Sequence, residues 1–246
     1  MEITSVSNNL VKECTKLQQK KYRIESGKFL LEGYKAIKEA YDFGIELEYI
    51  FVNKKNTSEY DFVKNILVTN EAVLEKLSTT DSAPNAIAIG IQKQYSIEEF
   101  KKFKKVVLLE NIKDAGNLGT IIRSCVAFGA DGIVLYGDCI DLYNPKCVRA
   151  SVGNLWKLPI IHFSDFKLLK ETFNSFERIA TLPRTKNLLK DFEPKGPILL
   201  MYGSEADGLS ENLIEFSTNS VKIEMAQTVE SLNLATSVSV FLYKIM

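Results

Sequence analysis

The chain has 246 residues, enough for one large domain or a small domain followed by a medium one, at roughly 150 residues per domain. Its 31 basic residues balance its 31 acidic residues, which excludes a wholly basic nucleic-acid binder. Any polyanionic partner must therefore meet a local basic patch. Hydrophobic residues make up 46% and charged residues 25%, as in ordinary globular proteins and unlike disordered or collagen-like chains.

The apolar runs are short. Runs such as residues 106–109 and 198–201 end far below the roughly 20 residues that a membrane-spanning helix needs. The N-terminal segment, which begins MEITS, lacks the basic start and apolar stretch of a secretory signal. These patterns predict a cytoplasmic protein without a membrane span.

Metal-binding chemistry is not expected. The sequence has one histidine, His162, and four cysteines without Cys-x-x-Cys spacing: Cys14, Cys125, Cys139 and Cys147. Structural zinc needs four clustered nitrogen or sulfur ligands, so we expect no metal site, and scattered cysteines of this kind typically serve as small hydrophobes. His162 follows the apolar run 159–161, which favours a partly buried structural histidine at the end of a strand over a Ser–His–Asp triad.

The first third of the chain alternates between helical and strand patterns. Residues 5–21 are expected to form one amphipathic helix, because Leu10, Cys14 and Leu17 recur at helical spacing. The further expected elements are a strand over 29–33, a helix over 34–43, a strand over 47–52, a helix over 70–77 and a strand over 86–91. They predict a small α/β domain over residues 1–95, followed by a lysine-rich linker over 96–105.

Positive charge is concentrated in this first part. Three acidic residues between positions 12 and 38 face eight basic ones: Lys12, Lys16, Lys20, Lys21, Arg23, Lys28, Lys35 and Lys38. Such a segment fits either a solvated helix face or a patch that binds RNA phosphates.

From residue 106 onward, short apolar strands alternate regularly with helices. The expected strands are 106–109, 132–135, 159–162, 178–182, 197–202 and 220–223, and the expected helices are 118–128, 146–152, 166–175 and 231–245. This pattern predicts a mostly parallel sheet covered on both faces over residues 106–246. Because ligands of such sheets bind beyond the carboxyl ends of the strands, the loops after Leu109, Tyr202 and Ile223 are the candidate site.

The first and third of these loops carry polar side chains at helix starts. Asn117 is expected to cap the helix that carries Arg123, six positions further on, whose long side chain can reach back. Ser231 and Asn233 open an otherwise apolar helix, where capping explains one polar residue but not two.

The second loop excludes two nucleotide-binding classes. Its glycines, Gly203 and Gly208, are spaced as in a phosphate loop, but Leu209 stands where that loop needs its lysine. No Gly-x-Gly-x-x-Gly turn follows any strand, which excludes the usual dinucleotide fingerprint and the glycine-rich loop of Rossmann-type methyltransferases.

Taken together, the loops resemble the SpoU (TrmH-like) RNA ribose 2′-O-methyltransferases of the SPOUT superfamily. Residues 114–124 (DAGNLGTIIRS) resemble motif 1, residues 203–210 motif 2 and residues 230–235 (ESLNLA) motif 3. Residues 143–153 resemble the stretch between motifs 1 and 2, and residues 28–33 resemble a small ribosomal-protein-like substrate-binding domain. The chain departs from the family at Ala115, where members often have proline, and at Leu234–Ala235, where Val-Ser is frequent.

The resemblance implies an α/β knot, a trefoil-knotted and mostly parallel sheet, preceded by a small α/β substrate-binding domain. It implies S-adenosylmethionine as cofactor, contacted by Gly203, Ile223 and Leu232. It also implies a homodimer that acts on RNA, with ribosomal RNA favoured over tRNA. The implied catalytic residues are Arg123, which activates the ribose hydroxyl, Asn117, which orients Arg123 or the ribose, Glu205, which holds the loops, and Ser231 and Asn233, which complete the pocket.

The methyl donor of such a reaction is already activated, so the protein must align the ribose hydroxyl and remove its proton. An arginine is a poor base because its neutral form is scarce. We therefore expect Arg123 to grip an RNA phosphate and stabilise the developing alkoxide. The alternatives are a tRNA methyltransferase, a non-catalytic RNA-binding homologue, and a small-molecule hydrolase, which would lack a nucleophile–base pair. An apolar stripe on the last helix suits either the core or a dimer interface; it comprises Leu232, Ala235, Val238, Leu242 and Ile245.

Overall fold

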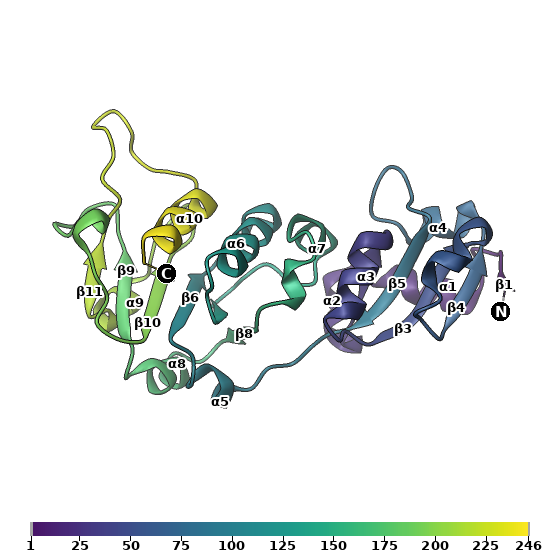
Figure 1. The fold of residues 1–246 in the computed structure, drawn as a ribbon, viewed down its shortest axis with the longest axis horizontal. Helices are drawn as coiled ribbons and strands as arrows, with labels where there is room; N and C mark the ends of the chain where they lie inside the picture. The colour runs from purple at the N-terminus through teal and green to yellow at the C-terminus, as the bar shows by residue number, and fades with distance from the viewer. Residues whose placement is uncertain (1, 246) are drawn as a thin grey trace. The chain divides into compact units, whose positions relative to one another are not determined.

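Two separate β-sheets organise the chain in the computed structural model, which describes residues 2–245 (Figure 1). Unit 1 contains the residues up to Lys93 together with Asp141–Trp156. Unit 2 contains Gln94–Ile140 and the residues from Lys157 onward. The sequence predicts a linker over residues 96–105 and a second domain over 106–246, whereas here the segment 141–156 packs with unit 1 and the segment 96–105 lies in unit 2.

Unit 1 is built on a five-stranded mixed sheet of order β1-β4-β3-β5-β2. Strand β5 runs antiparallel to both β2 and β3, whereas the β1–β4 and β3–β4 pairs are parallel. The strands are β1 (Glu2–Ile3), β2 (Lys28–Glu32), β3 (Leu47–Asn53), β4 (Ile66–Thr69) and β5 (Ala86–Ile91). The helices are α1 (Asn9–Lys16), α2 (Lys20–Ser26), α3 (Tyr34–Asp42), the 3-10 helix η1 (Lys54–Tyr60), α4 (Glu71–Leu77), α7 (Pro145–Ala150) and the 3-10 helix η2 (Asn154–Trp156).

The single helix predicted over residues 5–21 is wrong, because the chain forms two helices there, α1 and α2. Leu17 is the C-cap of α1 and is itself buried. The side chain of Gln18 then donates hydrogen bonds to the carbonyls of Lys76, Leu77 and Ser78 at the end of α4. These contacts hold the break between α1 and α2 against another helix.

The two faces of the first sheet are covered differently. Helices α1 and α4 pack on one face through a buried apolar cluster that includes Cys14, Leu30 and Leu74. The buried ring of Phe29 instead packs against the segment 141–156, with ring centroids 4.7 Å from Tyr143 and 5.3 Å from Trp156. This segment is therefore part of the core of unit 1.

A buried ion pair fixes the same segment to unit 1. Arg23 Nε lies 2.6 Å from Asp141 Oδ2, and the two side chains are 2% and 10% exposed. The guanidinium also donates to the carbonyl of Leu17. Further along, Arg149 binds Glu32 and Thr79.

Several basic residues between positions 12 and 38 are buried or ion-paired, so fewer of them are available to a polyanionic partner than the sequence suggests. Arg23 is buried, Lys28 pairs with Glu48, and Lys38 pairs with Asp42. Lys21 lies 3.8 Å from Glu25. The exposed lysines of this segment that have no ion pair within residues 2–245 are Lys12, Lys16, Lys20 and Lys35.

Unit 2 contains a six-stranded sheet of order β11-β9-β10-β6-β7-β8, in which every pair is parallel. This confirms the predicted α/β class with a parallel sheet; the trefoil knot stays a prediction. The strands are β6 (Lys105–Glu110), β7 (Gly132–Tyr136), β8 (Ile160–Phe163), β9 (Glu177–Thr181), β10 (Ile198–Tyr202) and β11 (Asn219–Val221). The helices are α5 (Ile97–Phe100), α6 (Ala115–Ala127), α8 (Phe166–Phe173), the 3-10 helix η3 (Leu189–Asp191), α9 (Glu211–Phe216) and α10 (Leu234–Ile245).

Helices cover both faces of the second sheet. Buried residues of α8 and α9, such as Phe173 and Leu213, share one core with Leu108 of β6. On the other face α6 and α10 lie side by side (Figure 1), and Phe241 of α10 meets the ring of Tyr202 edge-on. Three members of the apolar stripe predicted on the last helix, Ala235, Val238 and Leu242, are buried here.

The segment 96–105, for which the sequence predicts a lysine-rich linker, contains a short helix and part of the core of unit 2. A capping box between Ser96 and Glu99 starts α5 within it. Phe100 is fully buried in the core of unit 2, and Phe103 packs against that core. The two aromatic residues were not recognised as core residues in the sequence because lysines surround them.

Several other expectations can be compared with the structure. The four cysteines are free and buried. His162 lies at the end of β8, as expected, but it is exposed, and its Nε2 makes a 2.8 Å hydrogen bond with the Gly137 carbonyl. Within residues 2–245 there is no group of three or more His, Cys, Asp or Glu that could hold a metal ion. No helix in that range is long and apolar enough to cross a membrane.

Candidate active site

The candidate site lies where the order of strands in unit 2 reverses direction. Strands β6 and β10 are neighbours at the centre of the sheet. Strands β7 and β8 lie beyond β6 on one side, and β9 and β11 lie beyond β10 on the other. At such a switch point the loops that leave the carboxyl ends of neighbouring strands diverge and leave a crevice. The loops after β6 and β10 are the first and second loops that the sequence indicated.

The prediction that Asn117 caps the helix after the first loop is wrong. Helix α6 begins at Ala115, and its N-cap is Asp114, whose carboxylate accepts the backbone N–H of Asn117 at 2.7 Å. The capping position therefore falls three residues earlier, on a side chain of equal capping strength. As a result, the side chain of Asn117 is available for other contacts.

A chain of hydrogen bonds joins all three loops through Asn117. Its Nδ2 donates to Glu205 Oε1 in the second loop at 2.6 Å. Its Oδ1 accepts from Nδ2 of Asn233 in the third loop at 3.1 Å. All three residues were expected in the site from the sequence, and the structure brings them together.

The positions of the donors and acceptors fix the orientation of each side chain in this series of hydrogen bonds. An ionised carboxylate can only accept hydrogen bonds, so Asn117 must present its NH2 to Glu205 and its oxygen to Asn233. Asn233 Oδ1 in turn accepts the backbone N–H of Thr236 at 3.3 Å. The last helix begins at Leu234, so Ser231 and Asn233 precede it, and Asn233 caps it. The second oxygen of Glu205 has no hydrogen bond to any residue in the range 2–245.

The second loop folds tightly over Gly203. A Cβ at this position would lie 1.8 Å from the carbonyl carbon of Gly208 and 2.1 Å from the nitrogen of Leu209. Gly208 has a φ of +69°, which only glycine adopts readily. The resemblance implies a cofactor contact at Gly203, and the structure shows that the loop's own backbone occupies the place that a side chain at this position would take.

A cavity of about 780 Å³ lies between the second and third loops. Ligand pockets usually measure about 300–1,000 Å³, so it is large enough for a cofactor. The three expected cofactor contacts, Gly203, Ile223 and Leu232, all line it, as do Ser231 and Tyr202. The hydroxyl of Tyr202 is buried without a hydrogen-bond partner in the described chain, and burial holds its pKa well above the usual value.

Arg123 stands apart from the hydrogen-bonded chain. It is exposed on α6, and no residue from 2 to 245 binds its guanidinium. The next residue, Ser124, makes a 2.7 Å hydrogen bond to Ser239 and so attaches α6 to α10. The structure thus leaves the guanidinium open to a ligand, and Asn117 does not contact it.

Glu110 is a further residue that supports the site, and its role was not predicted from the sequence. It ends strand β6, is only 4% exposed, and accepts the backbone N–H of Ser210 at 2.8 Å. The last residue of β6 thereby holds the end of the second loop at Ser210. A single acidic residue after four apolar strand residues was the signal that could have revealed it, because carboxylates are rarely buried without a partner.

The comparisons with known proteins agree with this geometry. Residues 104–243 match the model of the SpoU rRNA methylase family, and residues 8–88 match that of an MRM3-like substrate-binding domain. The chain belongs to the SpoU rRNA methylase family. All eight candidate site residues lie within the range of the SpoU match, and the exposed lysines around α1 and α2 lie within the substrate-binding match.

Individual relatives match nearly the whole chain. An uncharacterized tRNA/rRNA methyltransferase of Synechocystis sp. is 34% identical over 98% of this chain and 92% of its own length. The 23S rRNA (guanosine(2553)-2′-O)-methyltransferase of Bacillus subtilis is 24% identical over 98% of both. An AdoMet-bound rRNA methyltransferase from Sinorhizobium meliloti superposes with a TM-score of 0.89 at 26% identity, covering 99% of this chain and 96% of that one.

Proposed function

We propose that this protein transfers the methyl group of S-adenosylmethionine to a ribose 2′-hydroxyl of ribosomal RNA. The observation that carries the proposal is the hydrogen-bonded chain Asn233–Asn117–Glu205. It closes three loops around one crevice at the switch point of a parallel sheet. Membership of the SpoU rRNA methylase family and the 23S rRNA activity named for the Bacillus subtilis relative support the choice of substrate.

The cavity fits the proposed cofactor. It is bounded by two irregular loops, whose backbone N–H and carbonyl groups can hold an adenine, and by apolar side chains such as Ile223 and Leu232. Gly203 keeps the second loop folded so that the cavity stays open on this side. When bound, S-adenosylmethionine supplies a methyl group already activated by its sulfonium.

The residues of the chain then have to position the ribose and manage its proton. The unpaired oxygen of Glu205 is a hydrogen-bond acceptor at the crevice, held in place by Asn117. Arg123 offers five N–H donors in a fixed fork and keeps its charge, which suits an RNA phosphate or a developing alkoxide. In this arrangement Arg123 clamps the substrate, and it is Glu205 that Asn117 orients.

The proposal is tested by incubating purified protein with methyl-labelled S-adenosylmethionine and unmethylated ribosomal RNA transcripts. We expect label in a ribose 2′-O-methyl group, and its loss in Arg123→Ala while cofactor binding by calorimetry persists. Failure of Arg123→Ala to bind cofactor would instead indicate a structural role for this residue. Transfer to tRNA alone would contradict the proposed substrate.

We further propose that the protein acts as a homodimer through the outer face of α6 and α10. Tyr243 is 79% exposed on α10 and Val240 is 38% exposed, and the ring of Phe128 at the end of α6 meets Tyr243 edge-on. Large apolar side chains gathered on one face are typical of an interface. Sedimentation should show a dimer at micromolar concentration that Tyr243→Asp dissociates; a monomeric wild type would contradict this proposal.

A further inference from the structure

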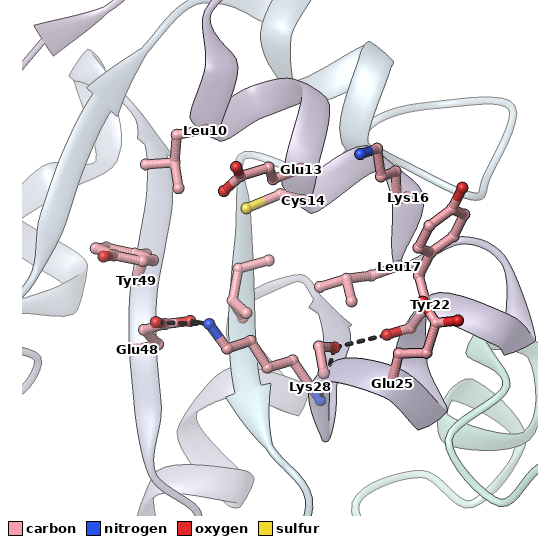
Figure 2. Close-up of a pocket in the computed structure, with 12 residues that line it drawn as sticks. Leu10, Glu13, Cys14, Lys16, Leu17, Tyr22, Glu25, Lys28, Glu48 and Tyr49 are labelled. Atoms are coloured by element: carbon pink, nitrogen blue, oxygen red, sulfur yellow. Dashed lines mark hydrogen bonds and ion pairs between the residues drawn. The ribbon is translucent and has the colours of Figure 1, made fainter.

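Unit 1 holds a cavity of its own, of about 330 Å³, between helices α1 and α2 and the sheet (Figure 2). Its apolar part consists of side chains such as Leu10, Leu17 and Ile89. Cys14 adds to this part as a neutral thiol, because burial and the nearby Glu48 raise its pKa to about 12. A flat apolar ring could therefore enter the cavity without leaving a charge uncompensated.

The polar wall of the cavity carries more hydrogen-bond acceptors than donors. Both oxygens of Glu48 lie within 2.7 Å of Lys28 Nζ, which forms one half-buried pair. Glu13 is exposed, and its carboxylate has no hydrogen bond or ion pair with any other residue between 2 and 245. Figure 2 shows Glu13 above the Cys14 sulfur and the Lys28–Glu48 pair on the opposite side. This wall suits a neutral ligand rich in N–H donors and repels a phosphate.

Positive charge lies instead around an aromatic ring at the edge of the cavity. The Nζ atoms of Lys16 and Lys21 lie 5.5 Å and 5.8 Å from the ring centroid of Tyr22, which also lines the cavity. Both lysines are exposed. Both ammonium groups lie over this ring, and Lys21 also contacts Glu25 at 3.8 Å. Cations beside a cavity that can take a base are a combination that binds single-stranded nucleic acid, because the phosphates on either side of the base meet the cations.

We propose that this cavity binds one unpaired guanine base of the substrate RNA. The Glu13 carboxylate would accept the adjacent N1–H and N2–H groups, and Lys28 would donate to O6. Lys16 and Lys21 would contact the flanking phosphates. Guanine is favoured because its Watson–Crick edge has two adjacent N–H donor groups, whereas that of uracil has one. The inference rests on the proposed function only in taking RNA as the substrate.

The test measures binding of fluorescently labelled pentaribonucleotides to the full-length protein by anisotropy. The probes are UUGUU, UUIUU, in which inosine lacks the N2 amino group, and UUUUU. Wild type should bind UUGUU about tenfold more tightly than UUIUU, because one hydrogen bond to a charged acceptor is lost. Glu13→Ala should bring this ratio to about one. Glu46→Ala, an exposed carboxylate outside the cavity, should leave it unchanged.

The ratio is the decisive quantity, since removing any acidic residue strengthens the nonspecific attraction to RNA. Equal binding of the three probes by wild type, no binding of any probe, or an unchanged ratio in Glu13→Ala would each overturn the proposal. Methyl transfer to ribosomal RNA is measured separately on the same preparations. Methylation without a guanine preference would contradict the guanine site alone. A Glu13-dependent guanine preference without methylation would contradict the proposed activity and support the guanine site.

Discussion

The side-chain amide of Asn117 donates a 2.6 Å hydrogen bond to the carboxylate of Glu205, a residue 88 positions further along the chain. Asn117→Asp would place two carboxylates against each other, and like charges at this distance repel. We expect this variant to lose at least about 100-fold in methyl transfer, which corresponds to roughly 2.7 kcal/mol in the barrier. Single-turnover rates with saturating cofactor measure the effect.

The reversed pair, Asn117→Asp with Glu205→Gln, separates two roles for Glu205. The glutamine can donate its NH2 to the aspartate, so the loops are joined again, while a neutral amide oxygen takes the place of the free carboxylate oxygen. If Glu205 only holds the loops, the double variant should recover most activity. We predict that it stays inactive although its melting temperature recovers, because a neutral amide oxygen cannot take up the proton of the ribose hydroxyl as a carboxylate can. Recovery of both properties would limit Glu205 to a structural part.

Gly203→Ala tests the folding of the second loop. Its Cβ would lie 1.8 Å from the Gly208 carbonyl carbon, so the loop must shift and the cavity must change shape. We expect S-adenosylmethionine affinity to fall at least about tenfold, or roughly 1.4 kcal/mol, by calorimetry. Gly196→Ala is the matched control, since nothing lies within 4 Å of its Cβ and no change is expected. Normal affinity in Gly203→Ala would contradict this role of the loop.

Much of unit 2 was predictable from sequence, because its strands are buried on both faces and appear as plain apolar runs bounded by loops. The missed elements carry weaker signals. Strand β1 has two residues, and Phe100 and Phe103 are masked by neighbouring lysines. The sequence also could not show that the segment 141–156 packs on Phe29, because that choice depends on long-range contacts.

The candidate site was predictable in its membership but not in its connections. Motif spacing identified Asn117, Glu205 and Asn233. The sequence did not show that Asp114 would cap α6, because Asp and Asn are equally good caps and both precede the apolar run. Glu110 was missed since its hydrogen bond to Ser210 joins residues 100 positions apart.

The Arg23–Asp141 pair should be a principal anchor of the segment 141–156. Removing one partner of a buried ion pair typically costs about 3–5 kcal/mol, because the other charge stays buried and unpaired. Arg23→Met should lower the free energy of urea unfolding by this amount, and Arg23→Met with Asp141→Asn by less. Lys21→Met breaks only exposed contacts, of 3.8 Å with Glu25 and 5.8 Å with the Tyr22 ring centroid, and serves as the control. An equally small effect of Arg23→Met would show that the segment is held by its aromatic contacts.

The protein should lose stability in alkaline solution. Burial raises the pKa of the Cys14 thiol from 9.0 to about 12 and that of the Tyr60 hydroxyl from 10.0 to about 12. Unfolded chains release these protons at the ordinary values, so this stabilisation is complete below about pH 9 and is lost as the pH rises toward 12. The melting temperature, measured at intervals of about half a pH unit, should fall between pH 8.5 and 10.5. It should fall less steeply in Cys14→Val. A constant melting temperature across this range would disagree with the burial of these groups.

The central claim is ribose methylation of ribosomal RNA, and mapping of 2′-O-methyl groups in total RNA tests it most directly. The comparison needs a strain that lacks this gene and the same strain carrying either the wild type or Arg123→Ala. We predict that one ribosomal RNA nucleotide loses its 2′-O-methyl group in the deletion strain, and that the wild type restores it whereas Arg123→Ala does not. Identical ribosomal RNA methylation in all strains, or a loss confined to tRNA, would contradict the claim.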